Sequence, residues 1–307
     1  MDTDLPPLMD PEVPSIRLVH SANSLSTLMA DPAWYEMIYV RGHRFDLSKE
    51  APLGFGSAYH AALEAGEKAL IATGSWQSAR EASVAKAHAI AAEGGLWEDR
   101  YRTAGSLKKV IAGYWQHWEQ SKHEPLAIEV PWTFELPIRS PSKLPYVICG
   151  RFDAIARVWG HNMVMERKHT TKPLDWDYWA NYRRAVQTRT YALAAHAGRG
   201  NVSVCLDACR LNLAEPKRGD VKPPEFARQL FEFTRADLEC HLQDIIAWIS
   251  AAQMWALNGH WPRRSSPWGP GKSWCDLLEL PPQERFKSAP DVQPFRHPLQ
   301  SIVAEEE

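Results

Sequence analysis

In three places an acidic residue is followed two positions later by a lysine, a pattern that sets an ammonium group beside a carboxylate able to hold a divalent cation. Glu215-Pro-Lys217 and Asp220-Val-Lys222 lie in a stretch rich in proline and glycine and are expected to be solvated loop charges. Glu166-Arg-Lys168 instead ends the apolar run Met163-Val-Met165. Strand alternation therefore puts Glu166 and Lys168 on one face, with Arg167 opposite.

A second carboxylate lies thirteen residues earlier, at Asp153, inside the apolar stretch Ile148-Cys-Gly-Arg-Phe-Asp-Ala-Ile. Burying a carboxylate without a partner is costly. Two adjacent strands would bring Asp153 beside Glu166, where the charges repel unless a cation lies between them. The spacing is compatible with a metal site or with a structural ion pair to Lys168.

Downstream of these strands, one predicted helix carries a polar stripe. Arg183, Gln187 and Tyr191 recur at i, i+4 and i+8 in a helix predicted over 176–197. The stripe either faces the carboxylates or forms an ordinary exposed polar face.

Basic and aromatic residues gather around the start of that helix. Lys172 precedes it and Arg184 lies within it, so that a phosphate backbone would bind here. Trp176 and Trp179 follow the basic turn and are candidates for base stacking, with core packing as the alternative.

The periodicity predicts an α+β protein whose first 120 residues are mainly helical. Helices are expected over 24–40, 56–71, 75–92, 103–120, 176–197 and 235–257. Strands are expected over 127–136, 146–158, 162–168 and 201–213, the first three forming an antiparallel meander.

The composition is that of a globular protein: 307 residues, 45% hydrophobic, with a net charge of −2. This charge excludes a uniformly basic nucleic-acid coat but permits a local basic patch. No apolar stretch reaches the roughly 20 residues that span a bilayer, and no secretory signal is recognised. The odd number of cysteines, five, favours reduced thiols in a cytoplasmic protein; Cys205 and Cys209 are expected to be buried thiols, not zinc ligands.

Several of these motifs together resemble a known family. Gly150-Arg-Phe-Asp-Ala-Ile155, Met165-Glu-Arg-Lys168 and Gln187-x3-Tyr191 resemble successive motifs of the PD-(D/E)XK nuclease superfamily, in its RecB-like exonuclease branch. Upstream, Gly56–Glu64 resembles the helical histidine motif of that branch, and Ser24–Trp34 resembles its opening segment. Order and spacing agree from about residue 20 to 280.

The resemblance implies a restriction-endonuclease-like core, a central mixed sheet flanked by helices, with an additional N-terminal helical segment. It implies Mg²⁺ or Mn²⁺ held by His60, Asp153, Glu166 and the backbone carbonyl of Arg167. Lys168 would position the attacking water, with Gln187 and Tyr191 beside it. Glu129 matches a less constant acid of the family and is a candidate second-metal ligand or an ordinary strand-surface carboxylate.

One departure from the branch concerns its iron–sulfur cluster. Many members hold a cluster through four cysteines, but this chain has Asp31 at the first position and only Cys275 in the far segment. We therefore expect no iron–sulfur cluster. The expected organisation is a flexible leader (1–22), one nuclease domain (23–280, with a helical insertion at about 72–125) and a flexible acidic, proline-rich tail (281–307).

The predicted function is that of a metal-dependent DNA exonuclease in recombination, repair or phage DNA processing. By the same resemblance it would act in the cytoplasm of a bacterial or phage-infected cell, on DNA ends or single strands, with a single-strand annealing or recombination protein as a possible partner. Two alternatives remain open: a structure-specific or nicking endonuclease of the same fold, and a non-catalytic DNA-binding scaffold.

Overall fold

The computed structural model describes residues 9–12, 17–42, 51–94, 96, 98–196, 201–212 and 222–263. The chain divides into two compact units, and each is described by itself. The first comprises Met1–Asp46, Glu135–Ile148 and Gln243–Glu307; the second comprises Leu47–Phe134 and Cys149–Leu242. The two loop triplets at 215–217 and 220–222, Cys275 and the tail at 281–307 lie at least partly outside the described residues.

The first unit opens with strand β1 (Val19–Ser21), inside the stretch expected to be a leader. Helix α1 (Ala22–Ala30), helix α2 (Pro32–Tyr35) and the π-helix η1 (Glu36–Val40) follow. The single helix expected over 24–40 is thus wrong. Asp31 is extended (φ −153°) because the residue before a proline disfavours the α conformation, and its side chain accepts from the Trp34 amide at the start of α2.

Within the described residues, a mixed sheet of six strands has the order β1-β3-β4-β5-β6, with β2 also paired to β3. Its remaining strands are β2 (Glu124–Arg139), β3 (Pro145–Val158), β4 (His161–Thr170), β5 (Val202–Arg210) and β6 (Glu225–Phe233). β3 and β4 are antiparallel, β4 and β5 parallel, and β5 and β6 antiparallel. The predicted α+β class with a mixed central sheet is confirmed.

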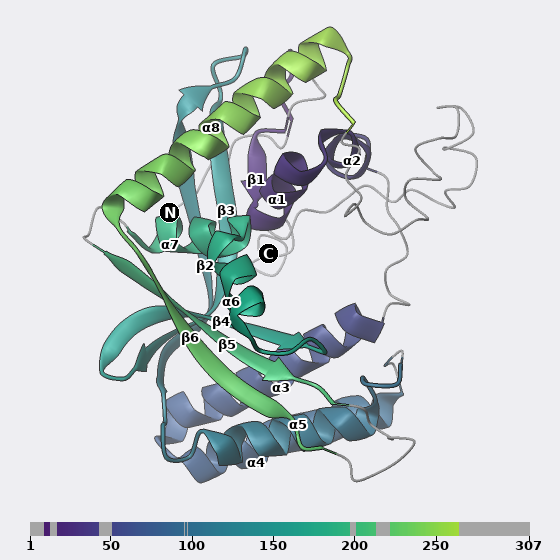
Figure 1. Cartoon of the computed structure of the whole chain (residues 1–307), viewed down its shortest axis with the longest axis vertical. Helices are drawn as coiled ribbons and strands as arrows, with labels where there is room; N and C mark the ends of the chain where they lie inside the picture. Colours follow the sequence, from purple (N-terminus) through teal and green to yellow (C-terminus); the bar gives the residue numbers. More distant parts are fainter. Residues whose placement is uncertain are drawn as a thin grey trace, which may run out of the picture. The chain divides into compact units, whose positions relative to one another are not determined.

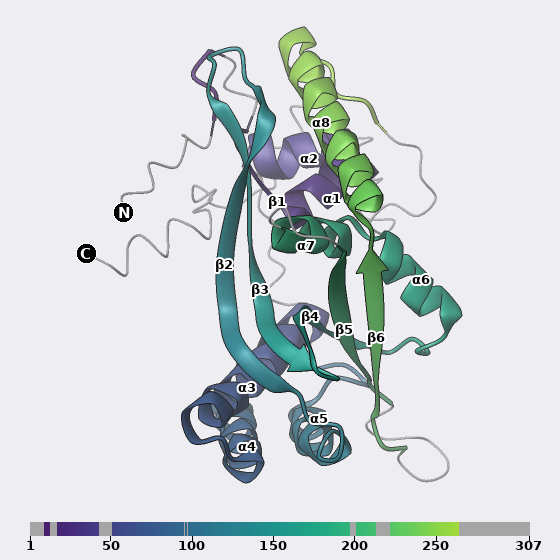
Figure 2. The same cartoon turned by 90° about the vertical axis from the view of Figure 1, so that its left-hand side faces the viewer.

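Two groups of helices flank the part of this sheet that belongs to the second unit (Figures 1 and 2). Helices α3 (Ala51–Thr73), α4 (Trp76–Glu93) and α5 (Ala104–His117) cover one face of β4, β5 and β6. Helices α6 (Trp176–Arg184) and α7 (Val186–His196) form the crossover that the parallel pair requires, and lie on the other face. Helix α8 (Arg235–Asn258) follows β6.

A large apolar core joins α3, α4 and α5 to the sheet. It includes Tyr59, Leu63, Trp115 and Cys209, each with no exposed surface. Gly66 permits the close approach of α3 and α4, because a Cβ atom there would lie 2.8 Å from the Ala79 carbonyl oxygen. Cys205 is likewise fully buried, as expected for a structural thiol.

One further prediction about elements is wrong, and one strand was missed. The helix expected over 176–197 is interrupted at Ala185, whose backbone is extended (φ −61°, ψ 136°), although no proline or glycine marks the break. Strand β6 was not predicted, because its sequence, Glu-Phe-Ala-Arg-Gln-Leu-Phe-Glu-Phe, contains no β-branched residue. It is held by its pairing with β5 along its whole length.

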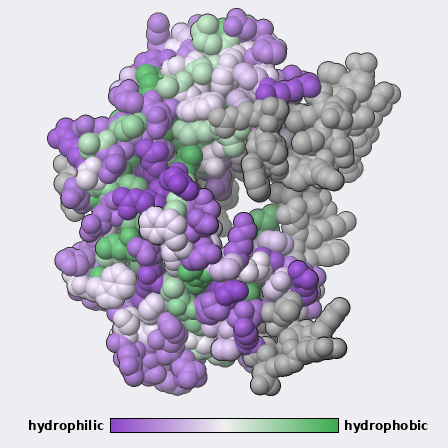
Figure 3. Space-filling model, viewed as in Figure 1, coloured by the Kyte–Doolittle hydropathy of each residue, from purple (hydrophilic) through white to green (hydrophobic). Residues whose placement is uncertain are grey.

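The coloured surface on the face shown in Figure 3 is mainly hydrophilic, with small groups of hydrophobic residues between. In the described part of the chain, no helix combines the length and apolar character needed to cross a bilayer.

Buried His241 at the start of α8 gives the second unit a testable pH dependence. Its Nε2 lies 3.0 Å from Thr190 Oγ1 on α7. Burial, aided by Arg189, lowers the pKa of His241 to about 3 from its ordinary 6.5. Between pH 6.5 and about 3, the unfolded chain binds a proton at His241 and the folded chain does not. The free energy of unfolding is therefore unaffected by this residue above pH 6.5 and decreases as pH falls toward 3.

We expect His241→Gln, which keeps an acceptor for Thr190, to reduce the slope of unfolding free energy against pH by up to about 1.4 kcal/mol per pH unit between pH 6.5 and 5. Urea titrations of both proteins at several pH values measure it. Equal slopes would contradict the assignment.

Candidate active site

The candidate site lies within the second unit, where β3 and β4 bring two carboxylates together. Ala154 pairs with Met165 at one end of the antiparallel ladder, and continuing that register places Asp153 opposite Glu166. The Arg167 amide donates a hydrogen bond of 2.8 Å to Asp153 Oδ2. The backbone of β4 thus holds the Asp153 carboxylate, as the spacing of the two residues led us to expect.

Glu166 is only 2% exposed and forms an ion pair with Lys168 through Oε1. Burial and the nearby Asp153 charge raise the pKa of Glu166 to about 7. Burial acts to lower the pKa of Lys168, but the Glu166 carboxylate outweighs it and raises that pKa overall. The two side chains sit on one face of β4, as strand alternation predicts.

Asp153 also faces His60 of α3, whose Nδ1 lies 3.4 Å from Asp153 Oδ1. Burial acts to raise the pKa of Asp153, but the hydrogen bond and charge of His60, together with Arg167, lower it overall. The two adjacent carboxylates are therefore pushed in opposite directions, Asp153 toward the ionised form and Glu166 toward the protonated form.

Glu129 lies at the edge of this group, at a bend in β2 where its φ is 51°, an uncommon value for any residue other than glycine. Arg151 Nε is 2.5 Å from its Oε2. Burial raises the pKa of Glu129, and the charges of Asp153 and Glu64 raise it further. Glu129 is therefore close enough to Asp153 for their charges to interact.

Helix α7 supplies two neutral polar groups. Gln187 Nε2 donates a hydrogen bond of 3.1 Å to the Tyr191 hydroxyl. The Tyr191 ring packs against Phe152 and Trp132, with centroids 5.4 Å and 5.9 Å away. After burial, the Glu166 charge is the main cause that raises the pKa of Tyr191, so this phenol lies near the carboxylates.

Arg183 does not share that helix, because the break at Ala185 separates it from Gln187. The predicted stripe of three residues is therefore reduced to two. Arg183 is exposed and acts electrostatically on Asp237 at the start of α8.

The other predicted DNA contacts lie on α6 and the turn before it. Trp176 is 82% exposed, while Lys172 and Arg184 are also on the surface. Trp179 is half-buried and its ring packs at 5.0 Å against Tyr178. Lys172, Trp176 and Arg184 are thus exposed on α6 and the turn before it, whereas Trp179 is only partly so. Tyr182 of α6 acts electrostatically on Lys168 in the carboxylate site, and sequence analysis did not predict this residue.

On the opposite face of β4, Arg167 enters a buried charge network that sequence analysis also missed. Its guanidinium pairs with Glu67 of α3, and Glu67 Oε1 also lies 2.8 Å from His123 Nε2. Burial acts to raise the pKa of Glu67, but Arg167 and His123 lower it overall, which keeps the carboxylate ionised. His60, Glu64 and Glu67 recur at i, i+4 and i+7, a spacing that could have revealed one polar face of α3.

The network continues across the sheet to β5 and β6. Arg228 Nη2 lies 3.0 Å from His123 Nδ1 and 2.9 Å from Asp207 Oδ2, which also accepts from the Tyr114 hydroxyl at 2.7 Å. Arginine can only donate and a carboxylate can only accept, so neutral His123 carries its proton on Nε2. Each ion pair thus has a neutral hydrogen-bonding partner inside the core.

Two observations fit the binding of a divalent cation by the residues around Asp153 and Glu166. Glu166 Oε2 is buried and has no hydrogen-bond partner within the described ranges. The available donors are mainly carboxylate and carbonyl oxygens, which hard cations prefer. Among the described residues no three acidic, histidine or cysteine side chains already meet as a ligand cluster.

Comparison with known proteins agrees with this geometry. Residues 20–278 match the sequence profile of the PD-(D/E)XK nuclease superfamily, so the chain belongs to that superfamily. The mixed sheet flanked by helices is its restriction-endonuclease-like fold. A search of curated proteins finds no match. A solved structure described as "Crystal structure of SSO0001" is similar at 18% identity with a TM-score of 0.25, over 44% of this chain and 55% of that one.

The buried network makes a prediction about stability. Glu67→Ala leaves the Arg167 guanidinium buried without its counter-charge, which costs about 3–5 kcal/mol. Glu64→Ala, one turn away, removes a largely exposed ion pair with Lys68 and should cost at most about 0.5 kcal/mol. Urea denaturation of both variants measures the difference, and similar small losses would show that Glu67 does not hold Arg167.

Proposed function

We propose that this protein is a deoxyribonuclease dependent on Mg²⁺ or Mn²⁺, acting as an exonuclease in DNA recombination, repair or phage DNA processing. Membership of the nuclease superfamily implies metal-dependent nuclease activity. The observation that carries the proposal for this chain is the buried Glu166, with one oxygen on Lys168 and the other without a partner, beside Asp153. Exonuclease action rests on the resemblance to the RecB-like branch.

The residues that would hold the cation are Asp153, Glu166, His60 and the carbonyl of Arg167, with Glu129 near a second ion. A bound divalent cation supplies Lewis acidity and neutralises charge on the phosphate. The Arg167 amide orients Asp153, and the Arg167 side chain, fixed by Glu67, holds the β4 backbone in place. No iron–sulfur cluster is part of the proposal.

Lys168 would orient the attacking water. Its ammonium lies at the outer edge of the Glu166 carboxylate and stays charged, because Glu166 keeps its pKa high. A charged donor there stabilises the negative charge that develops on the reacting oxygens. Gln187 and Tyr191 offer directional hydrogen bonds on the same side.

DNA would approach over the exposed group on α6. Lys172, Arg183 and Arg184 would contact phosphates, and Trp176 and Trp179 would contact bases. A local cationic surface of this kind lets a protein of net charge −2 bind DNA.

The remaining parts of the proposal concern context. The nuclease domain would comprise residues 23–280 with its helical insertion at about 72–125. It would act in the cytoplasm of a bacterial or phage-infected cell, on DNA ends or single strands, with an annealing or recombination protein as partner. Assaying blunt, 5′-tailed, 3′-tailed and circular DNA side by side with Mg²⁺ tests the exonuclease assignment, and efficient cleavage of the circle would favour an endonuclease.

The first functional prediction concerns the centre itself. Asp153→Ala, Glu166→Ala and Lys168→Ala should each abolish cleavage, and the first two should also weaken Mn²⁺ binding measured by calorimetry. Glu124→Gln, which alters an exposed carboxylate on β2, is the control and should retain full activity. A Lys168→Ala enzyme with a near wild-type rate would show that the centre is wrongly assigned.

The second functional prediction concerns α7. Gln187→Ala should lower the single-turnover rate more than DNA affinity, because placement of its amide matters most at the transition state. Tyr191→Phe should retain the packed ring while losing the hydroxyl bonded to Gln187. We expect about a tenfold loss of rate for each. Unchanged rates in both variants would remove α7 from the active site.

A further inference from the structure

Helix α3 meets the end of β4 at a glycine, one turn before His60. A Cβ atom at Gly56 would lie 3.1 Å from Cε1 and 3.7 Å from Nδ1 of His169. Carbon atoms in ordinary contact are about 3.5–4.0 Å apart, so even an alanine here would push against the ring. The backbone of α3 at Gly56 therefore rests directly on the imidazole of His169, with no side chain between them.

The sheet fixes His169 from the strand side. His169 pairs with Cys209 in the parallel ladder of β4 and β5, and Cys209 is fully buried. It follows Arg167 by two residues, so the strand repeat directs both side chains toward α3. The position of the His169 ring is thus set by the sheet and not by the helix that lies on it.

On the helix side, the His169 ring contacts the first turns of α3. Its centroid lies 5.3 Å from that of Phe55 and 6.3 Å from that of Tyr59, both of which are buried. The ring also forms a hydrogen bond with the backbone of Pro52. Because proline has no N–H group, the ring donates and the Pro52 carbonyl accepts. These contacts hold the ring flat between strand and helix.

Two contacts between α3 and β4 bracket His60. Gly56 rests on His169, and Glu67 pairs with Arg167. His60 follows Gly56 by four residues, about 6 Å along the helix axis, and precedes Glu67 by seven, about 10 Å. The contact at His169 is the nearer of the two, so it has the greater effect on the position of His60.

The position of His60 is sensitive to small shifts of α3. Its Nδ1 lies 3.4 Å from Asp153 Oδ1, outside the usual hydrogen-bond range of about 2.7–3.2 Å. A metal ligand must lie within about 0.2 Å of its proper distance. An alanine in place of Gly56 requires its neighbour to move by a few tenths of an ångström. If the helix makes that movement, His60 leaves the range in which it can hold a metal ion.

We propose that His169 is a positioning residue for His60: its ring sets the spacing between the first turns of α3 and β4, and Gly56 is the residue that this spacing requires. The inference rests on the proposed function for the role of His60 as a metal ligand, and it adds a residue outside the ligand set that controls the site. The alternative is that His169 only fills the core.

Binding of Mn²⁺ and of Ca²⁺ to the whole chain is measured by calorimetry without DNA, and thermal unfolding is recorded for each variant. The two ions separate the histidine from the oxygen ligands, because Mn²⁺ accepts an imidazole ligand whereas Ca²⁺ takes oxygen ligands. The variants are His60→Ala, Gly56→Ala, His169→Ala and the double variant that combines the last two. Gly54→Ala is the matched control, because it adds the same methyl group to the same helix where nothing lies within 4 Å.

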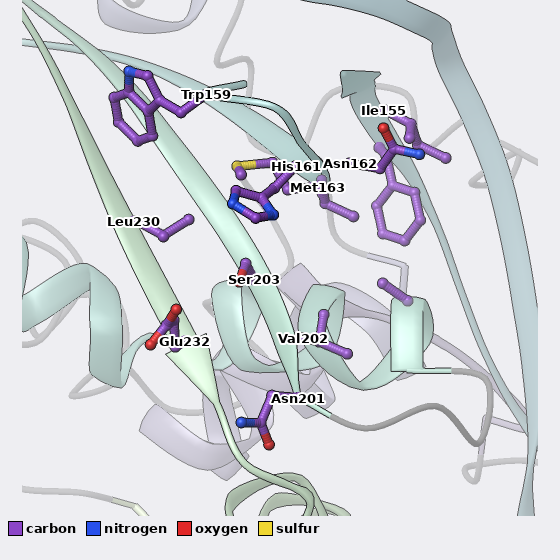
Figure 4. Close-up of a pocket in the computed structure, with 13 residues that line it drawn as sticks. Ile155, Trp159, His161, Asn162, Met163, Asn201, Val202, Ser203, Leu230 and Glu232 are labelled. Atoms are coloured by element: carbon purple, nitrogen blue, oxygen red, sulfur yellow. The ribbon is translucent and has the colours of Figure 1, made fainter. Parts of the chain in front are cut away.

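His161 supplies a second control, a histidine at the other end of the same strand. It is exposed and lines the pocket of about 600 Å³ beside the β3–β4 turn (Figure 4). The two-residue repeat places it on the same face of β4 as His169, but eight residues away, about 26 Å along the strand. His161→Ala thus removes an imidazole from β4 far from α3's first turns.

The expected pattern is a loss of Mn²⁺ affinity that follows the contact between Gly56 and His169. Gly56→Ala and His169→Ala each weaken Mn²⁺ binding about tenfold, as changes next to a ligand do, and Ca²⁺ binding by less than about twofold. His60→Ala gives the same selective loss. The double variant binds Mn²⁺ at least about threefold more tightly than Gly56→Ala, because the smaller side chain makes room for the added methyl group. Both controls keep wild-type affinity for both ions.

Three contrary results would overturn the proposal. Wild-type Mn²⁺ affinity in Gly56→Ala, beside weakened binding in His60→Ala, excludes the positioning role and leaves the proposed function in place. Equal losses for the two ions, or a double variant that binds no better than Gly56→Ala, identify His169 as a structural residue only. Wild-type Mn²⁺ affinity in His60→Ala removes His60 from the metal site, and this inference with it.

The proposed function fails on a different observation. None of these measurements uses cleavage, so a chain that binds Mn²⁺ through His60 and shows the double-variant recovery, yet never cleaves DNA, would contradict the proposed function alone.

Discussion

The two-residue repeat of β4 is the constraint on which the site depends. Because successive side chains of a strand point to opposite faces, Glu166 and Lys168 fall on one side of the sheet and Arg167 on the other. One strand can therefore carry the proposed catalytic groups and their anchor at once. A shift of register by one residue would exchange the two sets and bury Glu166 and Lys168 under α3. The antiparallel pairing with β3 fixes the register and adds Asp153 to the face of Glu166.

The buried network beneath β4 explains how that register is held. A buried ion pair adds little net stability, but the loss of one partner is heavily penalised. Glu67 and Asp207 each meet an arginine, while His123 and Tyr114 complete their hydrogen bonds. An alternative packing of α3 or β6 would leave at least one of these charges unpaired. The network thus favours a single arrangement of helix and sheet, and with it a single position for the Arg167 backbone.

Charge is also distributed unevenly over the second unit. Two carboxylates share a buried position, although each disfavours the ionised form of the other and both would repel DNA. The exposed cations lie nearby on α6 and the turn before it, outside the carboxylate group. In the proposed function, these cations would attract the phosphate backbone of DNA, while the carboxylates would hold the metal ion.

The sequence by itself determined the elements with strong periodicity and the motif residues on them. The strands around Asp153 and Glu166 and the three helices α3 to α5 follow from local patterns. Only the tertiary structure decided the rest. The weakly patterned strand β6 and the meeting of Glu67 with Arg167 depend on residues far apart in the chain, and no local signal marks the break at Ala185. The physical reason is that periodicity reports which face of an element is apolar, whereas the partner that covers it is chosen by packing and charge compensation between distant segments.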